Sequence, residues 1–215
     1  YLAFQHGYDI LESRDRFNEI NNDGWFPFME LVAKDFKILA EIYDSKFEIA
    51  PRIGQLLQGF SAERVRAFTN KWWSNPIFQQ KQSILEAGIK AYLQNTSAGN
   101  LQCIKTLLPE IEELIRLQRL AETREGRGST ARLIKYIGEK ATPKAGSEHS
   151  LLLPTKFVAY LTEVIFGEFD LEKGEVNLSH HSSSHGVANP DQYTRARALQ
   201  AILSLDQIYF YLRAA

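Results

Sequence analysis

Cysteine is almost absent from this sequence, since Cys103 is the only one among 215 residues. A single thiol excludes a disulfide scaffold and a structural zinc site built from cysteines. Long uncharged apolar runs are also lacking, and no stretch approaches the roughly 20 residues that a membrane-spanning helix requires. A signal-peptide pattern is missing as well. We therefore expect a soluble cytoplasmic protein without membrane contact, and the start at Tyr1 rather than Met predicts a trimmed or incomplete chain.

A large net charge is lacking too. The 25 Lys and Arg residues face 26 Asp and Glu residues, which gives a formal net charge of -1. This balance argues against a protein that coats nucleic acid by bulk electrostatics. The hydrophobic fraction of 44% is high enough for a folded core and excludes a disordered chain. Binding of a phosphate would therefore depend on a few local positive groups in a small cleft.

The period-two alternation that is typical of β-strands is missing, and helical periodicity runs through most of the chain. Apolar residues recur on one helical face in three long segments, at 104–115, 157–165 and 199–210. Shorter or less regular helices are expected near residues 3–20, 29–43, 62–72, 77–94 and 130–139. The pattern predicts an all-α fold.

The predicted helices are divided by segments of turn composition. Asn75-Pro76 separates two of them, because the residue before a proline avoids helical backbone. The run NTSAGN at 95–100 is a predicted turn. We expect an N-terminal helical region over residues 1–74 and a helical bundle over 75–215, although the two can form one continuous domain.

Three of the five histidines gather in one irregular segment, residues 167–192, which joins the last two long helices. Connections of this length inside a compact domain are often functional. The histidines lie in the run LSHHSSSHGVA as His180, His181 and His185. If the run is helical, His181 and His185 are four residues apart and project from the same face, while His180 points elsewhere.

Three interpretations of this histidine cluster remain open from the residues alone. An imidazole titrates near neutral pH and can transfer a proton in catalysis, and Ser182, Ser183 and Ser184 would keep such a site hydrated. A histidine pair at this spacing can also chelate zinc. No third ligand is nominated nearby, so we expect neither a metal nor another cofactor. The structural interpretation is that the histidines cap a helix or satisfy loop carbonyls.

Two acidic residues, Asp206 and Glu112, stand on the apolar stripes of predicted helices. Asp206 lies three residues after Leu203, and Glu112 lies four residues after Leu108. A carboxylate turned toward a core needs a partner, because its desolvation is costly. We hypothesise that one of these acids orients a histidine of the cluster or pairs with a buried arginine. The alternative is a half-exposed edge of the stripe.

The C-terminal part of the chain resembles a known family. The run NLSHHSSSHGVANPDQYTRARALQAILSLDQIYFYL is similar to the C-terminal signature of HEPN-like proteins. In that signature a short motif ending in His-Gly precedes a polar linker and a long Leu-rich helix that contains Asp. His181, His185 and Gly186 match the motif, and Asp206 lies in the helix that follows.

The resemblance extends to earlier segments of the chain. LLPEIEE at 107–113 looks like a Leu-Leu-Pro-x-Ile-Glu run of one bacterial branch, and Gly24-Trp25-Phe26 fits that branch more weakly. The resemblance implies an all-α HEPN-like bundle with an N-terminal helical extension. It also implies a homodimer with the histidine motif near a cleft at the dimer interface. Many such proteins are metal-independent endoribonucleases of defence systems, so RNA is the implied partner.

In the usual active motif of the family, an Arg four to six residues before a His holds the scissile phosphate. The His moves the proton of the ribose 2′-hydroxyl, whose attack leaves a cyclic phosphate. Here the corresponding positions before His185 are Ser179, His180 and His181, and none is Arg. The resemblance assigns His181 and His185 as the acid–base pair and places His180 at the phosphate. Asp206 and Glu112 are the supporting acids.

The missing positive charge is assigned to three arginines on or beside the Gly-rich loop: Arg124, Arg127 and Arg132. A histidine lacks the fixed, bidentate fork of the absent Arg. The resemblance therefore predicts an RNA-related or defence protein, namely an endoribonuclease of weak or lost activity. The alternative is a non-enzymatic helical dimer that binds a protein partner or a nucleotide through the same cleft.

Overall fold

The computed structural model describes residues 13–31, 34–125, 128–145, 153–169, 172 and 176–213. Every regular element within these ranges is a helix, which confirms the predicted all-α fold class. None of the described helices combines the length and the apolar composition needed to cross a membrane.

The first part of the described chain forms short helices that end before Asn75. In order they are α2 (Arg14–Asn22), α3 (Lys34–Ser45), α4 (Ile49–Gln58), α5 (Ala62–Thr69) and the 3-10 helix η1 (Asn70–Ser74). The sequence did not predict α4. The first twelve residues, which include most of the helix predicted over 3–20, lie outside the described residues.

The second part contains the longer helices. They are α6 (Pro76–Gln80), α7 (Gln82–Leu93), α8 (Ser97–Thr123), α9 (Thr130–Ala145), α10 (Pro154–Tyr160), the π-helix η2 (Leu161–Ile165), α11 (His180–Ser184), the 3-10 helix η3 (Pro190–Gln192) and α12 (Arg195–Leu212). The predicted helix over 77–94 is divided at Lys81 into α6 and α7.

Asn75 begins α6, and the break predicted at Asn75-Pro76 is present. Oδ1 of Asn75 accepts hydrogen bonds from the backbone N–H groups of Ile77 at 2.9 Å and Phe78 at 3.3 Å. Pro76 occupies the first helical position, where its missing N–H has no cost. Local capping chemistry therefore explains this boundary.

The turn predicted over 95–100 is shorter than expected, because α8 already begins at Ser97. The chain reverses at Asn95, which has a φ of +54°. Thr96 then caps α8, and its hydroxyl accepts a hydrogen bond from the backbone N–H of Gly99 at 3.0 Å. The polar residues of this run thus include a helix cap and the first turn of the helix.

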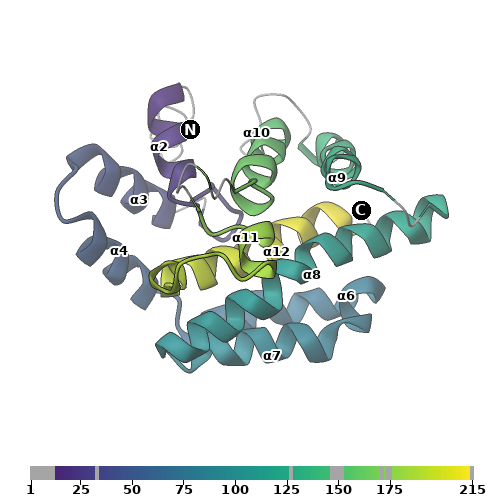
Figure 1. Ribbon diagram of the computed structural model, residues 1–215, viewed down its shortest axis with the longest axis horizontal. Coiled ribbons are helices and arrows are strands. Elements are labelled where there is room, and N and C mark those ends of the chain that lie inside the picture. Colours follow the sequence, from purple (N-terminus) through teal and green to yellow (C-terminus); the bar gives the residue numbers. More distant parts are fainter. Residues whose placement is uncertain are drawn as a thin grey trace.

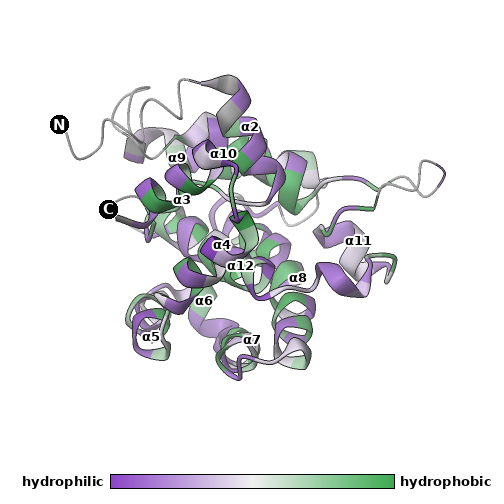
Figure 2. Ribbon diagram, turned by 90° about the vertical axis from the view of Figure 1, so that its left-hand side faces the viewer, coloured by the Kyte–Doolittle hydropathy of each residue, from purple (hydrophilic) through white to green (hydrophobic). Residues whose placement is uncertain are grey.

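α12 runs through the middle of the molecule (Figure 1). Of its 18 residues, 14 are buried, and it packs against α4, α7, α8 and α9. Leu199, Ile202 and Leu203 of the predicted apolar stripe are fully buried, and burial extends beyond the stripe to almost every side of the helix. A view turned by 90° shows other helices surrounding it (Figure 2).

Polar side chains of α12 attach the N-terminal helices to this central helix. Nε2 of Gln200 donates a hydrogen bond to the carbonyl of Asp23 at 2.9 Å, and the backbone N–H of Met29 donates to Oε1 of Gln207 at 3.0 Å. Buried amides need such partners. Residues from both predicted regions belong to one hydrophobic core.

Candidate functional site

The histidine cluster lies on and directly after α11, and two serines, Ser179 and Ser182, cap the N-terminus of this helix. Oγ of Ser179 accepts a hydrogen bond from the backbone N–H of Ser182 at 3.2 Å, and Oγ of Ser182 accepts one from the N–H of Ser179 at 2.8 Å. This reciprocal pair is a capping box. After His185 the chain leaves the helix through Gly186, whose φ of +74° suits a glycine.

Two of the three serines between the histidines do not hydrate the site, contrary to the expectation from the sequence. Ser182 and Ser183 are buried, and only Ser184 is exposed. Oγ of Ser182 donates to the carbonyl of Asn177 at 2.7 Å, and Nζ of Lys105 on α8 donates to the carbonyl of Ser183. These bonds attach α11 to its surroundings, so Ser182 and Ser183 are structural.

The three imidazole rings point into different surroundings. His180 is turned toward α8, and its Nε2 lies 3.2 Å from Oε2 of Glu112, with 15% of the His180 side chain exposed. His181 lines an open depression. His185 is exposed, and its ring centroid lies 5.8 Å from that of Phe169. Because α11 ends at Ser184, His185 follows the helix and does not continue it.

Burial lowers the pKa of His180 below its ordinary value of 6.5, although Glu112 and a hydrogen bond with the Leu108 backbone act in the opposite direction. The neighbouring His181 and His185 lower the pKa further. The lowered pKa keeps His180 neutral at pH 7. Its Nδ1 is buried and has no hydrogen-bond partner among the described residues.

Arg116 also contacts Glu112, although the sequence did not identify it as a candidate site residue. Arg116 lies one turn after Glu112 on α8, and its Nη2 pairs with Oε1 of Glu112. Its Nε lies 3.7 Å from Oε2 of Glu113, and its Nη1 donates to the carbonyl of Gly128 at 3.3 Å. The guanidinium thus holds the Glu112 carboxylate in place. The available signal was the four-residue spacing of Glu112 and Arg116 on a helix.

Two of the three arginines predicted from the sequence to bind phosphate lie in the described part of the chain. Arg124 is the exposed C-cap of α8, with a φ of +61°, and Arg132 is exposed near the start of α9. Arg127 lies outside the described residues. Within the described part of the chain, no recorded contact joins Arg124 or Arg132 to the histidines. Their assignment to phosphate binding stays a prediction.

The hydrogen-bond partner of Asp206 is an indole, not the histidine or arginine that we hypothesised. Oδ1 of Asp206 accepts a hydrogen bond from Nε1 of Trp72 at 2.7 Å, and Asp206 is 7% exposed. Burial raises the pKa of Asp206 to about 7, although the bond from Trp72 lowers it. Of the two acids, Glu112 is the one that contacts the histidine cluster.

The depression beside His181 has a volume of about 750 Å³ and lies among α9, α10, η2 and α11. This volume is within the range of small-molecule sites. Ser129, Thr130, Lys135 and Glu168 provide polar groups, and Phe166 forms part of an apolar wall. The adjacent η2 is a π-helix, a rare conformation that occurs often at functional sites. The depression can therefore bring a ligand to the imidazole of His181.

Replacing Ser179 by Ala should destabilise α11 by about 1 kcal/mol, because the capping box loses one of its two oxygens. Since α11 holds His180 in its buried position, a frayed helix should raise the pKa of His180 toward its ordinary value. An NMR titration of the imidazole measures this shift. Ser184→Ala, at an exposed position of the same helix, is the control, and an unchanged His180 titration in Ser179→Ala would contradict the role of the cap.

Among the described residues, no group of three or more His, Cys, Asp or Glu side chains is arranged to hold a metal ion. No protein-family model, no curated protein and no solved structure matches this chain. Fold and site together define an all-α protein with a histidine-lined depression. The likeness to HEPN-like proteins rests on the sequence motif and stays a prediction.

Proposed function

We propose that this protein binds RNA in the depression among α9, α10, η2 and α11 and cleaves it weakly, without a metal ion. The observation that carries the proposal is the placement of His181, whose ring lines the depression one residue after a neutral His180 anchored on Glu112. His181 and His185 are the acid–base pair, and His180 and Glu112 are positioning residues.

The proposed reaction is attack of the ribose 2′-hydroxyl on the neighbouring phosphorus. One imidazole accepts the hydroxyl proton while the new phosphorus–oxygen bond forms. The bond from phosphorus to the 5′-oxygen breaks, and the second imidazole gives that oxygen a proton. The products are a 2′,3′-cyclic phosphate and a 5′-hydroxyl. Such proton transfer by positioned side chains contributes about 10²- to 10⁴-fold to a rate.

Weak activity follows from the absence of Arg at the motif positions before His185, which are Ser179, His180 and His181. His180 is neutral and faces Glu112, so it does not bring a positive charge to the phosphate position where the resemblance places it. Arg116 is engaged by two glutamates. The phosphate would instead contact the hydroxyl of Thr130 and Lys135 in the depression, where a point charge replaces a bidentate fork. Lys135 forms an exposed ion pair with Glu139, at 3.8 Å, which a phosphate can displace.

The proposal is tested by incubating the full chain in EDTA with a labelled unstructured RNA and a structured RNA. We expect slow cleavage that leaves cyclic-phosphate ends, spares the matching DNA, and falls about 100-fold or more in His181→Ala and His185→Ala. Ser184→Ala, on the same helix and exposed, should cleave like the wild type. Equal cleavage by the wild type and both histidine variants would reject the enzyme.

A second candidate function is binding without cleavage, in a helical dimer that uses the same depression. The observation that favours it is the engagement of Arg116 by Glu112 and Glu113, which leaves no guanidinium for the phosphate at that point. Binding that His181→Ala weakens, without any cleavage by the wild type, would support this function over the first. Sedimentation of the full chain tests the dimer separately.

A further inference from the structure

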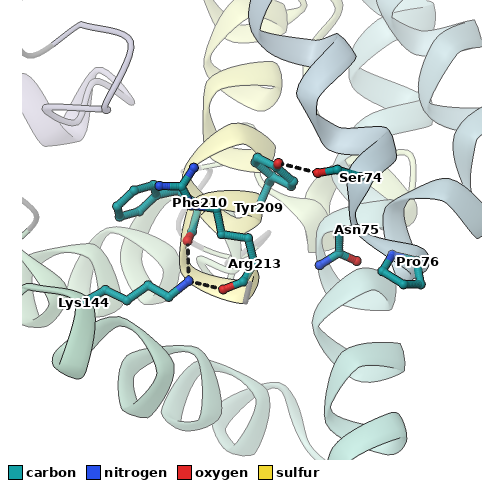
Figure 3. A pocket seen from close by; sticks show the side chains of 7 residues that line it. All are labelled: Ser74, Asn75, Pro76, Lys144, Tyr209, Phe210 and Arg213. Carbon is teal, nitrogen blue, oxygen red and sulfur yellow. Dashed lines mark hydrogen bonds between the residues drawn. The ribbon is translucent and has the colours of Figure 1, made fainter. Parts of the chain in front are cut away.

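A basic recess lies at the C-terminal end of α12, where that helix meets η1, α6 and α9 (Figure 3). It consists of two adjoining hollows of about 600 and 830 Å³ that share Asn75, Pro76, Lys144 and Arg213 in their walls. Both volumes are in the range of small-molecule sites. Nothing in the proposed reaction uses this recess.

Lys144 supplies the first positive charge of the basic recess. Its Nζ donates to the carbonyl of Phe210 at 2.9 Å and to the carbonyl of Arg213, the last carbonyls of α12. An ammonium has three donors, so one remains for a ligand. Burial, followed by the positive charges of Arg213 and Lys140, lowers the pKa of Lys144. These neighbours therefore repel one another in the empty protein, and an anion would relieve the repulsion.

Arg213 supplies the second positive charge. Its guanidinium lies 4.6 Å from the ring centroid of Phe210, and the residue is exposed. In the ranges that the structure describes, no carboxylate forms an ion pair with Lys144 or Arg213, whereas Lys140 pairs with Glu122. Glu122 and Glu139 line the larger hollow, whereas, among the described residues, the wall of the smaller one contains Lys144 and Arg213 and no carboxylate. Two cations that face the smaller hollow without a carboxylate are an arrangement suited to an anion.

An uncharged group of the basic recess, the amide of Asn75, can also donate a hydrogen bond to a ligand. Oδ1 of Asn75 is occupied by the cap of α6, and Figure 3 shows the amide nitrogen turned toward Arg213. Pro76, Phe210 and Leu212 supply apolar wall, and the charged side chains of Glu122, Glu139 and Lys140 line only the larger hollow. The hollows are larger than a bare oxyanion requires, so the apolar wall can cover an attached organic group.

We propose that the basic recess binds a phosphate monoester carried on a small aromatic or apolar group. The doubly charged phosphate meets Lys144, Arg213 and the amide of Asn75, and the organic group packs against Pro76 and Phe210. This site is separate from the histidine cluster. Thr130 and Lys144 lie at opposite ends of α9, about 21 Å apart at 1.5 Å per residue.

The test uses phenyl phosphate as the probe, with the full chain in chloride buffer at constant ionic strength and calorimetry as the readout. We expect a Kd of about 1 mM or tighter, with weaker binding of inorganic phosphate and of benzoate. Arg213→Gln should weaken phenyl phosphate about tenfold or more, because Arg213 is exposed and its loss leaves the core intact. Lys37→Gln, an exposed lysine on α3, should bind like the wild type.

Lys144→Gln is a second variant, which also removes a partner of the α12 carbonyls, so its circular dichroism is recorded first. A folded Lys144→Gln protein should bind at least tenfold more weakly. Equal affinity in Arg213→Gln and Lys37→Gln would overturn the proposal. So would binding of phenol as tight as that of phenyl phosphate, or no binding up to about 10 mM, which corresponds to under 3 kcal/mol.

Discussion

Replacement of Asp206 by Asn should make the protein more stable at pH 8 and flatten its stability profile between pH 5 and 8. In the folded state burial raises the pKa of Asp206 to about 7, with the Glu30 carboxylate adding to the rise. The ordinary value of 3.8 applies to the unfolded chain. The folded state therefore binds the proton more tightly, and its stability falls as the pH rises through 7.

The size of this effect follows from linkage. One pKa unit corresponds to about 1.4 kcal/mol, so the loss attributable to Asp206 is about 2–3 kcal/mol between pH 5 and 8. Asn has nearly the same shape, stays neutral and can still accept the bond from Trp72. Urea unfolding of wild type and variant at each pH, followed by circular dichroism, gives the free energy of unfolding of each protein. In the difference between the two pH profiles, the contributions of the other titrating groups cancel.

A matched control is Asp191→Asn, because Asp191 is exposed in η3. Its stability curve should run parallel to that of the wild type across the whole pH range. If the Asp206→Asn curve is also parallel to the wild type, the buried carboxylate does not take up a proton in the folded state. The predicted coupling would then be wrong.

Replacement of Gly99 by Ala should destabilise the protein by about 2–4 kcal/mol. A Cβ at this position would lie 2.3 Å from the backbone carbonyl oxygen of Ala91, where α7 and α8 approach each other. That oxygen belongs to a helix and cannot rotate away like the end of a side chain. The two helices must therefore move apart, which disturbs the packing of α8, the helix that carries Glu112 and Arg116.

Gly54→Ala is the matched control for this prediction. Gly54 also lies within a helix, α4, but a Cβ there would meet nothing within 4 Å. Alanine has the better helix propensity, so this change should stabilise the protein by up to about 1 kcal/mol. Urea denaturation of both variants tests the opposite signs. Similar small effects at Gly99 and Gly54 would show that α7 and α8 move apart at little cost in stability. The prediction for Gly99 would then be wrong.

Much of the candidate site was predictable from short-range patterns. The density of histidines in residues 177–188 identified the segment, and the location of Glu112 on an apolar stripe indicated that its carboxylate needs a partner. The direction of each imidazole was not predictable. It depends on the capping box of Ser179 and Ser182 and on the buried contact with α8, which together turn His180 toward Glu112 and leave His181 in the depression.

By itself the sequence determined the helical class, the break at Asn75 and the segment that carries the histidines, because periodicity and capping act over a few neighbouring residues. The tertiary structure alone decided the partners of the two acids. Asp206 meets Trp72, 134 residues away in the chain, and Glu112 meets His180. Contacts between residues so distant in sequence depend on how the helices pack around α12, and no local sequence pattern predicts that packing.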